Sequence, residues 1–252
     1  MPHKIDPEDE RIRKLLERDP IGNLTIKGEL EAAKGSEGEI EVYIDDPRSP
    51  KGVLVTDYWV KIHAQDEAAL AELLQAITWE EARFGGVARW IRDYLIGIGG
   101  WELTWENPCW LYYLEPGDLR EELIRHEIRP LRPEDAELVN EHWEFGSAES
   151  VEYVRWRIEA GPSCAIFKGD RPVSWALTHG DGQMGLMFTL PEARGKGYGL
   201  SVTVALAREI LARGRIPFLY TLHDNLPAQR LAERAGFRRW GDYRWLGARR
   251  RG

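Results

Sequence analysis

The part of the sequence that decides the fold reads PEARGKGYGLS over residues 191–201. Its three glycines are Gly195, Gly197 and Gly199. They permit positive φ and a close approach of the backbone, so several N–H groups can converge on one point. A helical pattern over residues 200–213 follows, and a helix start attracts phosphate through its unpaired N–H groups and the helix dipole. Because Arg194 and Lys196 add positive charge, the segment predicts a pyrophosphate-binding loop.

Two better-known phosphate loops do not fit this segment. A Walker loop needs Ser or Thr directly after its Gly-Lys pair, whereas Gly197 follows Lys196 here. The dinucleotide fingerprint spaces its glycines as G-x-G-x-x-G, whereas this segment has G-x-G-x-G and follows a series of strands. A glycine turn without a ligand and a nucleotide site unrelated to coenzyme A stay open as alternatives.

The surroundings of the loop predict a mixed α/β fold. In chain order, the patterns are a strand over 128–131, helices from 133 and over 149–159, strands over 163–168, 172–179 and 184–190, the helix over 200–213, a strand over 216–222, a helix over 226–235 and a strand near 242–246. This order is typical of an α+β layer with a mixed sheet and differs from a continuous parallel alternation.

The first half of the chain predicts a smaller α/β domain. Its patterns are helices over 7–18, 66–76 and 87–95, strands over 24–30, 39–44 and 101–106, a loop over 34–38, and a strand or hairpin over 53–62. Nothing in this half places polar side chains in a catalytic pattern.

Charge divides the chain in the same place. Residues 1–125 carry 15 Lys and Arg against 26 Asp and Glu, a net charge of −11, and residues 126–252 carry 19 against 16, a net charge of +3. We therefore expect two domains, an acidic one over 1–125 and one over 126–252 that binds any anionic small ligand. The net charge of −8 argues against nucleic acid as a partner.

Other sequence features exclude several classes of protein. No apolar run reaches the roughly 20 residues that a membrane helix needs, so we expect no membrane partner. Cys109 and Cys164 lack a CxxC or His companion, so neither a disulfide framework nor a metal site is expected. The first residues show no signal or transit peptide, which predicts a cytoplasmic protein.

Two separated segments together resemble a known family. Residues 194–199 match the R/Q-x-x-G-x-G/A motif of the GCN5-related N-acetyltransferases, and Asn225, Ala228 and the pair Gly236-Phe237 match their second segment. The runs PVSWAL (172–177), GQM (182–184) and TLPE (189–192) resemble glycine N-acyltransferases in particular. The resemblance extends over about 128–240 and faintly over 10–80.

The resemblance implies a fold and an activity. The C-terminal half would have the acyl-CoA N-acyltransferase fold, and a degenerate repeat of that fold is one interpretation of the N-terminal half. The protein would transfer an acyl group from acetyl-CoA or another acyl-CoA to the amine of a small molecule or amino acid, by direct attack in a ternary complex. No metal takes part, and a homodimer stays open.

The resemblance also implies which residues bind the cosubstrate. They are Phe188, Thr189, Leu190, Arg194, Gly195, Lys196, Gly197, Tyr198, Gly199, Leu200, Ser201, Asn225 and Ala228. The backbone of residues 188–190 would hold the pantetheine arm and polarise the thioester carbonyl.

The catalytic groups depart from the family pattern at two positions. Gln183 stands where glycine N-acyltransferases have a Glu base, and Ala232 stands where related enzymes often have a Tyr acid. The candidates for the chemistry are therefore His179 as base, Gln183 as a group that orients the amine, and Asn225. A non-catalytic acyl-CoA-binding or regulatory module is the alternative.

Overall fold

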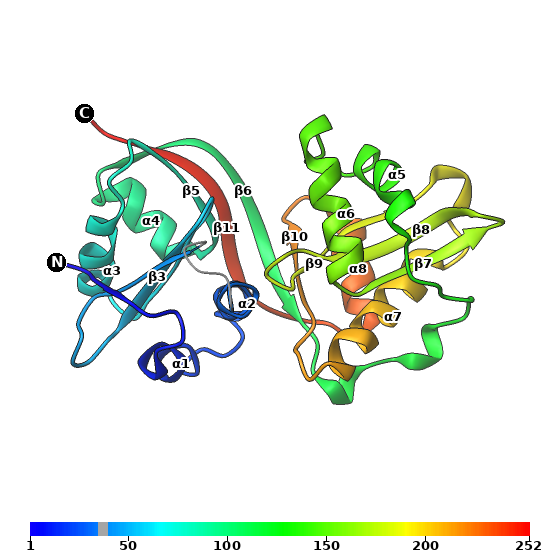
Figure 1. Ribbon diagram of the computed structural model, residues 1–252, viewed down its shortest axis with the longest axis horizontal. Coiled ribbons are helices and arrows are strands. Elements are labelled where there is room, and N and C mark those ends of the chain that lie inside the picture. The colour runs from blue at the N-terminus through cyan, green and yellow to red at the C-terminus, as the bar shows by residue number, and fades with distance from the viewer. Residues whose placement is uncertain (35–39) are drawn as a thin grey trace. The chain divides into compact units, whose positions relative to one another are not determined.

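Two units share the chain in the computed structural model, which describes residues 1–34 and 40–252 (Figure 1). The N-terminal unit comprises Met1–Leu111 and Trp240–Gly252, and the C-terminal unit comprises Tyr112–Arg239. The end of the chain therefore belongs to the first unit. The division into functional domains over 1–125 and 126–252 that the sequence indicates stays a prediction.

The N-terminal unit is built on a mixed sheet. Its elements are β1 (His3–Ile5), α1 (Glu10–Leu16), α2 (Leu24–Ala32), β2 (Glu41–Ile44), β3 (Gly52–Thr56), β4 (Val60–Ala64), α3 (Glu67–Leu73), β5 (Glu81–Ala88), α4 (Arg89–Gly97), β6 (Trp101–Tyr113) and β11 (Arg238–Arg250). The strand order is β1-β2-β3-β4-β5-β11-β6. The neighbouring pairs β1–β2, β2–β3, β3–β4 and β5–β11 are antiparallel. The pair β4–β5 is parallel.

Both faces of strand β3 are buried because helices cover each of them. Every residue of β3 is buried, and its side chains alternate between two cores as a strand requires. Val53 and Val55 belong to the core that includes Ile12 and Ile26 of α1 and α2. Leu54 belongs to the other core, which α3 and α4 complete.

Two predictions for this half were wrong or incomplete. Residues 24–30 were expected as a strand but lie in α2, since Ile26 and Leu30 are one helical turn apart and pack on the same core. The helix predicted over 87–95 began two residues too early, because residues 87 and 88 are the end of β5 and α4 begins at Arg89. The predicted loop over 34–38 and the first residue of the strand over 39–44 fall largely outside the described residues.

The C-terminal unit contains a three-stranded antiparallel sheet flanked by helices (Figure 1). Its elements are α5 (Ala136–Glu141), α6 (Val151–Ala160), β7 (Ser163–Lys168), β8 (Arg171–Thr178), β9 (Met184–Thr189), α7 (Tyr198–Ala212), β10 (Phe218–Leu222) and α8 (Leu226–Ala235). Residues Pro172–Thr178 of β8 are all buried, and both α6 and α7 contact this strand. The predicted strand over 128–131 contributes only a bridge between Arg129 and Ala165.

The two halves of the chain repeat one order of elements. The first runs from β1 to β6 and the second from the bridge at Arg129 to β11, and each has a strand or bridge, two helices, three strands, a helix, a strand, a helix and a final strand. The final strand of the second half, β11, lies almost entirely in the N-terminal unit. The fourth and fifth strands of this order behave differently. In the N-terminal unit β4 and β5 are in register at Val60 and Phe84. In the C-terminal unit β9 and β10 contact each other but belong to different sheets.

Some features do not occur in the described part of the chain. Along residues 1–34 and 40–252, no helix combines the length and apolar character needed to cross a bilayer. Among the same residues, no three His, Cys, Asp or Glu side chains are grouped to hold a metal ion. Cys109 and Cys164 are buried free thiols, and burial raises the pKa of Cys164 to about 12.

Candidate active site

The glycine-rich loop connects β9 to α7 and adopts a backbone that only glycine accepts easily. After the Leu190 N–H donates to the Val173 carbonyl at 2.9 Å, one turn over Pro191–Ala193 leads into the loop. Gly195 has φ of 76° and Gly197 has φ of 78°. A Cβ on Gly195 would meet nothing within 4 Å, so glycine is required here by its conformation and not by lack of space.

The loop presents unpaired donors at the start of a long helix. The helix has 15 residues, and Gly197 occupies its N-cap position without a side-chain cap. The Ser201 N–H is the first to find a helical acceptor, the Gly197 carbonyl at 3.1 Å. The N–H groups before it have no acceptor within the helix, as at every helix start. Together with the helix dipole, they form a site that favours phosphate.

Three cations lie in or beside the loop. Arg194 Nε donates to the Thr189 carbonyl at 3.1 Å, and Lys196 Nζ donates to the Glu192 carbonyl at 3.1 Å. The third is Lys168 at the end of β7, whose ammonium lowers the pKa of Lys196 through their interaction. A bound anion would relieve the repulsion between these two ammonium groups. The sequence analysis missed Lys168 because only the fold brings it to the loop.

Strand β9 is irregular next to the loop. Leu186 has φ of 46°, and the register with β8 shifts between Trp175 and Leu177. Such a bulge bends a strand and changes the direction of its backbone groups. Because β9 is the last strand of its sheet, the backbone of Phe188 and Thr189 has an edge that can accept an extended ligand.

Several predicted contact residues use their side chains for structure. Ser201 is 1% exposed, and its hydroxyl donates to the Leu123 carbonyl at 2.9 Å. Leu190 and Leu200 are buried as well. The Asn225 Oδ1 accepts from the Ala228 N–H at 3.1 Å and caps α8. These residues can therefore offer a ligand mainly backbone groups, and Asn225 its amide N–H groups.

The predicted base His179 lies beside the bulge of β9. Its Nδ1 is 3.0 Å from the Tyr153 hydroxyl, and a Cβ on Gly185 would collide with its Nε2. Gln183 lies in the turn between β8 and β9, where its carbonyl accepts from the His179 N–H at 2.8 Å. Three of the residues expected from the sequence thus divide between two places, His179 and Gln183 at the start of β9 and Asn225 at the start of α8.

His142 is a candidate that the sequence analysis missed. Its Nδ1 lies 3.1 Å from the Leu138 carbonyl. Since a carbonyl only accepts, Nδ1 carries the proton, and the neutral ring has its lone pair on Nε2. The ring packs on Phe188 with 4.6 Å between centroids and on Trp175 at 5.8 Å. No motif surrounds His142 in the sequence, so no local signal marks it.

The family and the curated proteins that are similar to this chain each match about a third of it. The FR47-like protein family matches residues 164–246. Glycine N-acyltransferase of Bos taurus is 34% identical over 84 residues, which make up 32% of this chain and 28% of that enzyme. Glycine N-phenylacetyltransferase of Bos taurus is 33% identical over 87 residues, 34% of this chain and 29% of that enzyme. The chain therefore matches less than a third of the length of either relative.

Solved structures match both halves. An X-ray structure of a Drosophila protein has a TM-score of 0.80 and 19% identity, and it covers 98% of this chain and 97% of its own. A tandem GNAT protein from the clavulanic acid biosynthesis pathway has a TM-score of 0.58 and 11% identity, with coverage of 98% and 97%. A putative acetyltransferase of the GNAT family from Novosphingobium aromaticivorans has a TM-score of 0.55 and 16% identity, with coverage of 92% and 97%. At these identities the matches confirm the predicted fold.

Proposed function

We propose, from the premise that this chain has the fold of the GCN5-related N-acetyltransferase superfamily, that it is an acyl-CoA-dependent N-acyltransferase. Its acceptor would be the amine of a small molecule or amino acid. The observation that carries this proposal is the loop with left-handed Gly195 and Gly197, which presents bare helix N–H groups next to the open edge of β9. The resemblance to glycine N-acyltransferases makes glycine the first acceptor to test.

The residues of the loop fit the charged end of coenzyme A. The N–H groups before Ser201 would donate to the pyrophosphate oxygens, and Lys168, Arg194 and Lys196 would offset their negative charge. The edge of β9 at Phe188 and Thr189 would bind the pantetheine amides by main-chain hydrogen bonds. The bulge at Leu186 would turn a backbone N–H towards the acyl carbonyl oxygen.

The chemistry needs one base and one route for a second proton. When bound, acyl-CoA supplies an acyl group activated as a thioester. An acceptor that arrives as an ammonium gives up two protons, one before its nitrogen attacks and one as the C–N bond forms and the C–S bond breaks. One proton would leave through His142 Nε2 to water, and the other would neutralise the departing thiolate. His142 is proposed for this role because its lone pair is on Nε2 and its ring packs on Phe188.

Three side chains would position the acceptor. Tyr153 and His179 form a hydrogen-bonded pair beside Gly185, and Gln183 follows in the adjoining turn. An amide cannot take up a proton usefully near neutral pH, so Gln183 would orient the amine by hydrogen bonds. His179 stays the second candidate for the base.

The test is turnover by the full chain over two panels. Thiol release is followed with acetyl-CoA, longer aliphatic acyl-CoAs and aromatic acyl-CoAs, each against glycine, other amino acids and simple amines. We expect release that depends on both substrates, with the N-acylated product identified by mass spectrometry. Coenzyme A binding with no product from any pair would contradict the proposal.

A non-catalytic acyl-CoA-binding module is favoured by one observation. Ala232, at the position where a Tyr acid is common, is buried in α8, so no side chain can serve there as a proton donor. This alternative expects acyl-CoA binding by calorimetry and no turnover. It also expects no activity in Gln183→Glu.

A further inference from the structure

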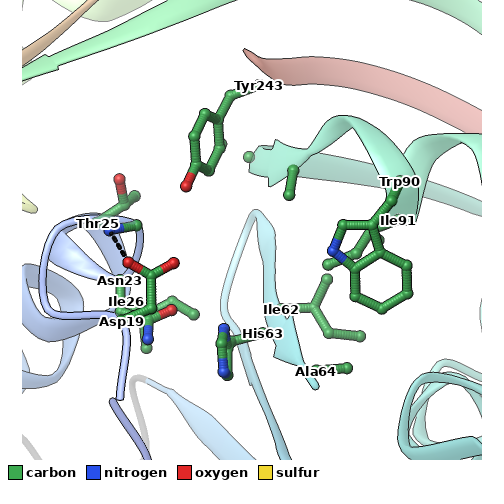
Figure 2. Close-up of a pocket in the computed structure, with 14 residues that line it drawn as sticks. Asp19, Asn23, Thr25, Ile26, Ile62, His63, Ala64, Trp90, Ile91 and Tyr243 are labelled. Carbon is green, nitrogen blue, oxygen red and sulfur yellow. Dashed lines mark hydrogen bonds between the residues drawn. The ribbon is translucent and has the colours of Figure 1, made fainter. Parts of the chain in front are cut away.

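The N-terminal unit contains a cavity of about 80 Å³ (Figure 2). It lies beyond the register pair Val60–Phe84 of β4 and β5, so residues 62–64 of β4 and Gly85, Gly86 and Ala88 of β5 line it. The turn before α2, the first residues of α4 and one tyrosine of β11 complete the wall. By element order this place corresponds to the gap between β9 and β10 in the other unit, although no glycine-rich loop accompanies it here.

One side of the cavity carries a carboxylate and a phenol. Asp19 Oδ1 accepts from the Gly22 N–H at 2.9 Å. A Cβ on Gly22 would collide with Asp19 Oδ2 and would lie 2.6 Å from the Tyr243 hydroxyl, so both oxygens gather at this glycine. Burial and the Asp19 charge raise the pKa of Tyr243, which keeps the phenol neutral. Figure 2 shows both side chains directed towards the hollow.

The imidazole of His63 also lines the cavity, and one of its nitrogens lacks a hydrogen-bond partner in the part of the chain that the structure describes. The His63 Nε2 is buried, and among the described residues it has no hydrogen-bond partner. Burial lowers the pKa of His63 against the opposing effect of Asp19, so the ring is neutral near pH 7. A buried polar atom without a partner is costly unless a ligand or water satisfies it. In the Nδ1–H tautomer, Nε2 of this cavity-lining ring carries a lone pair that no described residue uses.

The opposite side is apolar and aromatic. Ile62 and Ile91 face the polar groups across the cavity, and the Trp90 ring stands beside them. An indole face attracts cations, and the aliphatic side chains suit a short hydrocarbon chain. The volume admits several water molecules or a ligand of only a few heavy atoms.

We propose that this cavity binds a small aliphatic primary ammonium compound. The carboxylate of Asp19 and the lone pair of His63 Nε2 accept N–H bonds, and a primary ammonium brings three such donors together with a charge opposite to that of Asp19. An anion is disfavoured by Asp19, and the cavity groups too few ligating side chains for a metal site. This inference concerns the N-terminal unit and does not depend on the acyltransferase activity proposed for the C-terminal unit.

The experiment is calorimetry and ligand-observed NMR on the full chain without coenzyme A, with ethylammonium chloride as the probe. Ethanol, acetate and tetramethylammonium serve as uncharged, anionic and N–H-free probes. We expect ethylammonium to bind and the other three to bind at least tenfold more weakly. Equal binding of tetramethylammonium or ethanol, or no binding of ethylammonium up to millimolar concentration, overturns the proposal.

Matched variants test whether ethylammonium binds in this cavity. Asp19→Asn keeps an acceptor for the Gly22 N–H and removes the charge, and it should weaken ethylammonium at least tenfold. Asp57→Asn is its control, because Asp57 makes the same kind of bond to the Trp59 N–H at 2.8 Å and does not line the cavity. Ala88→Leu fills the cavity and should abolish binding while the melting temperature is retained. Unchanged affinity in folded Asp19→Asn would place the amine elsewhere, including the proposed acceptor site, and overturn this inference alone.

Discussion

At the same place in the element order, β4 leads into α3 in the N-terminal unit and β9 leads into α7 in the C-terminal unit. The first connection contains Asp66, whose carboxylate accepts from the Ala69 N–H at 2.9 Å and pairs with Lys51. The second contains Gly197, which leaves the helix start without a side-chain cap. A protein carboxylate thus already occupies the position that an anionic ligand would take in the other unit. The two helix starts therefore differ in whether the chain itself already supplies the negative group or leaves the N–H groups for a ligand.

The largest effect is expected when the C-terminal unit receives the cap of the N-terminal unit. Gly197→Asp places a carboxylate on the helix start and strains a backbone with φ of 78°, so coenzyme A should bind at least about a hundredfold more weakly. Calorimetry with coenzyme A measures this. Gly214→Asp is the control. Gly214 has φ of 71°, and a Cβ on it would meet nothing within 4 Å. Equal affinity in the two variants would refute the loop as the pyrophosphate site.

In the C-terminal unit, the proposed anion site belongs to the same unit as an imidazole that packs on the edge strand. His142→Gln should lower kcat by about a hundredfold, the usual contribution of a general base, and leave coenzyme A affinity unchanged. His179→Gln should cost less and act mainly on KM for the acceptor. If His179→Gln shows the larger loss of kcat and His142→Gln shows none, the two roles are exchanged.

Removing one of the two neighbouring lysines tests whether their charge contributes to coenzyme A binding. Lys168→Gln removes the neighbour that lowers the pKa of Lys196, and with it one cation beside the loop. We expect coenzyme A to bind about three- to tenfold more weakly, with a smaller salt dependence. The exposed Lys14 on α1 offers the control substitution Lys14→Gln, which should change neither quantity. A salt dependence equal to that of the unaltered protein would remove Lys168 from the site.

Local patterns predicted much of this fold but not the groups brought together by distant parts of the chain. The helix expected over 200–213 is α7 over Tyr198–Ala212, because its glycine start and apolar spacing are adjacent in sequence. His142 and Phe188 are 46 positions apart, and no pattern around either residue indicates their contact. The same holds for Lys168 beside Lys196, and for the end of β11, which joins the N-terminal unit.

The error in α2 has a different cause. Leu24, Ile26 and Leu30 satisfy an alternating pattern as well as a helical one, so periodicity alone could not decide between them. Packing decides, since Ile26 and Leu30 meet the core formed with β2 and β3 from one helix face. Thr25 and Ile26 of this helix line the cavity, so the misread segment forms part of its wall.

Removing the cap in the N-terminal unit should have a smaller effect than adding a cap in the C-terminal unit. Asp66→Ala removes the cap of α3 and should lower the melting temperature by about 2–4 °C, the usual effect of losing such a cap in a chain of this size. It should not create a coenzyme A site, because residues 65–67 contain no glycine that can adopt the left-handed backbone. Thermal unfolding and calorimetry measure the two expectations. New binding of coenzyme A to this unit would show that the cap alone decides.

The smallest effect concerns His63 on β4. Burial lowers the pKa of His63 in the folded chain, so the unfolded chain takes up a proton first as the pH falls below about 6.5. The contribution of this group to stability is therefore complete above that pH and declines as the pH falls towards the folded pKa. His63→Gln removes the titration, so its melting temperature should fall less between pH 7.5 and 5.5 than that of the unaltered protein. Arg18 adds to the lowering and Asp19 opposes it, so Asp19→Asn should steepen the decline. Parallel curves for all three proteins would mean that His63 is not buried as a neutral ring.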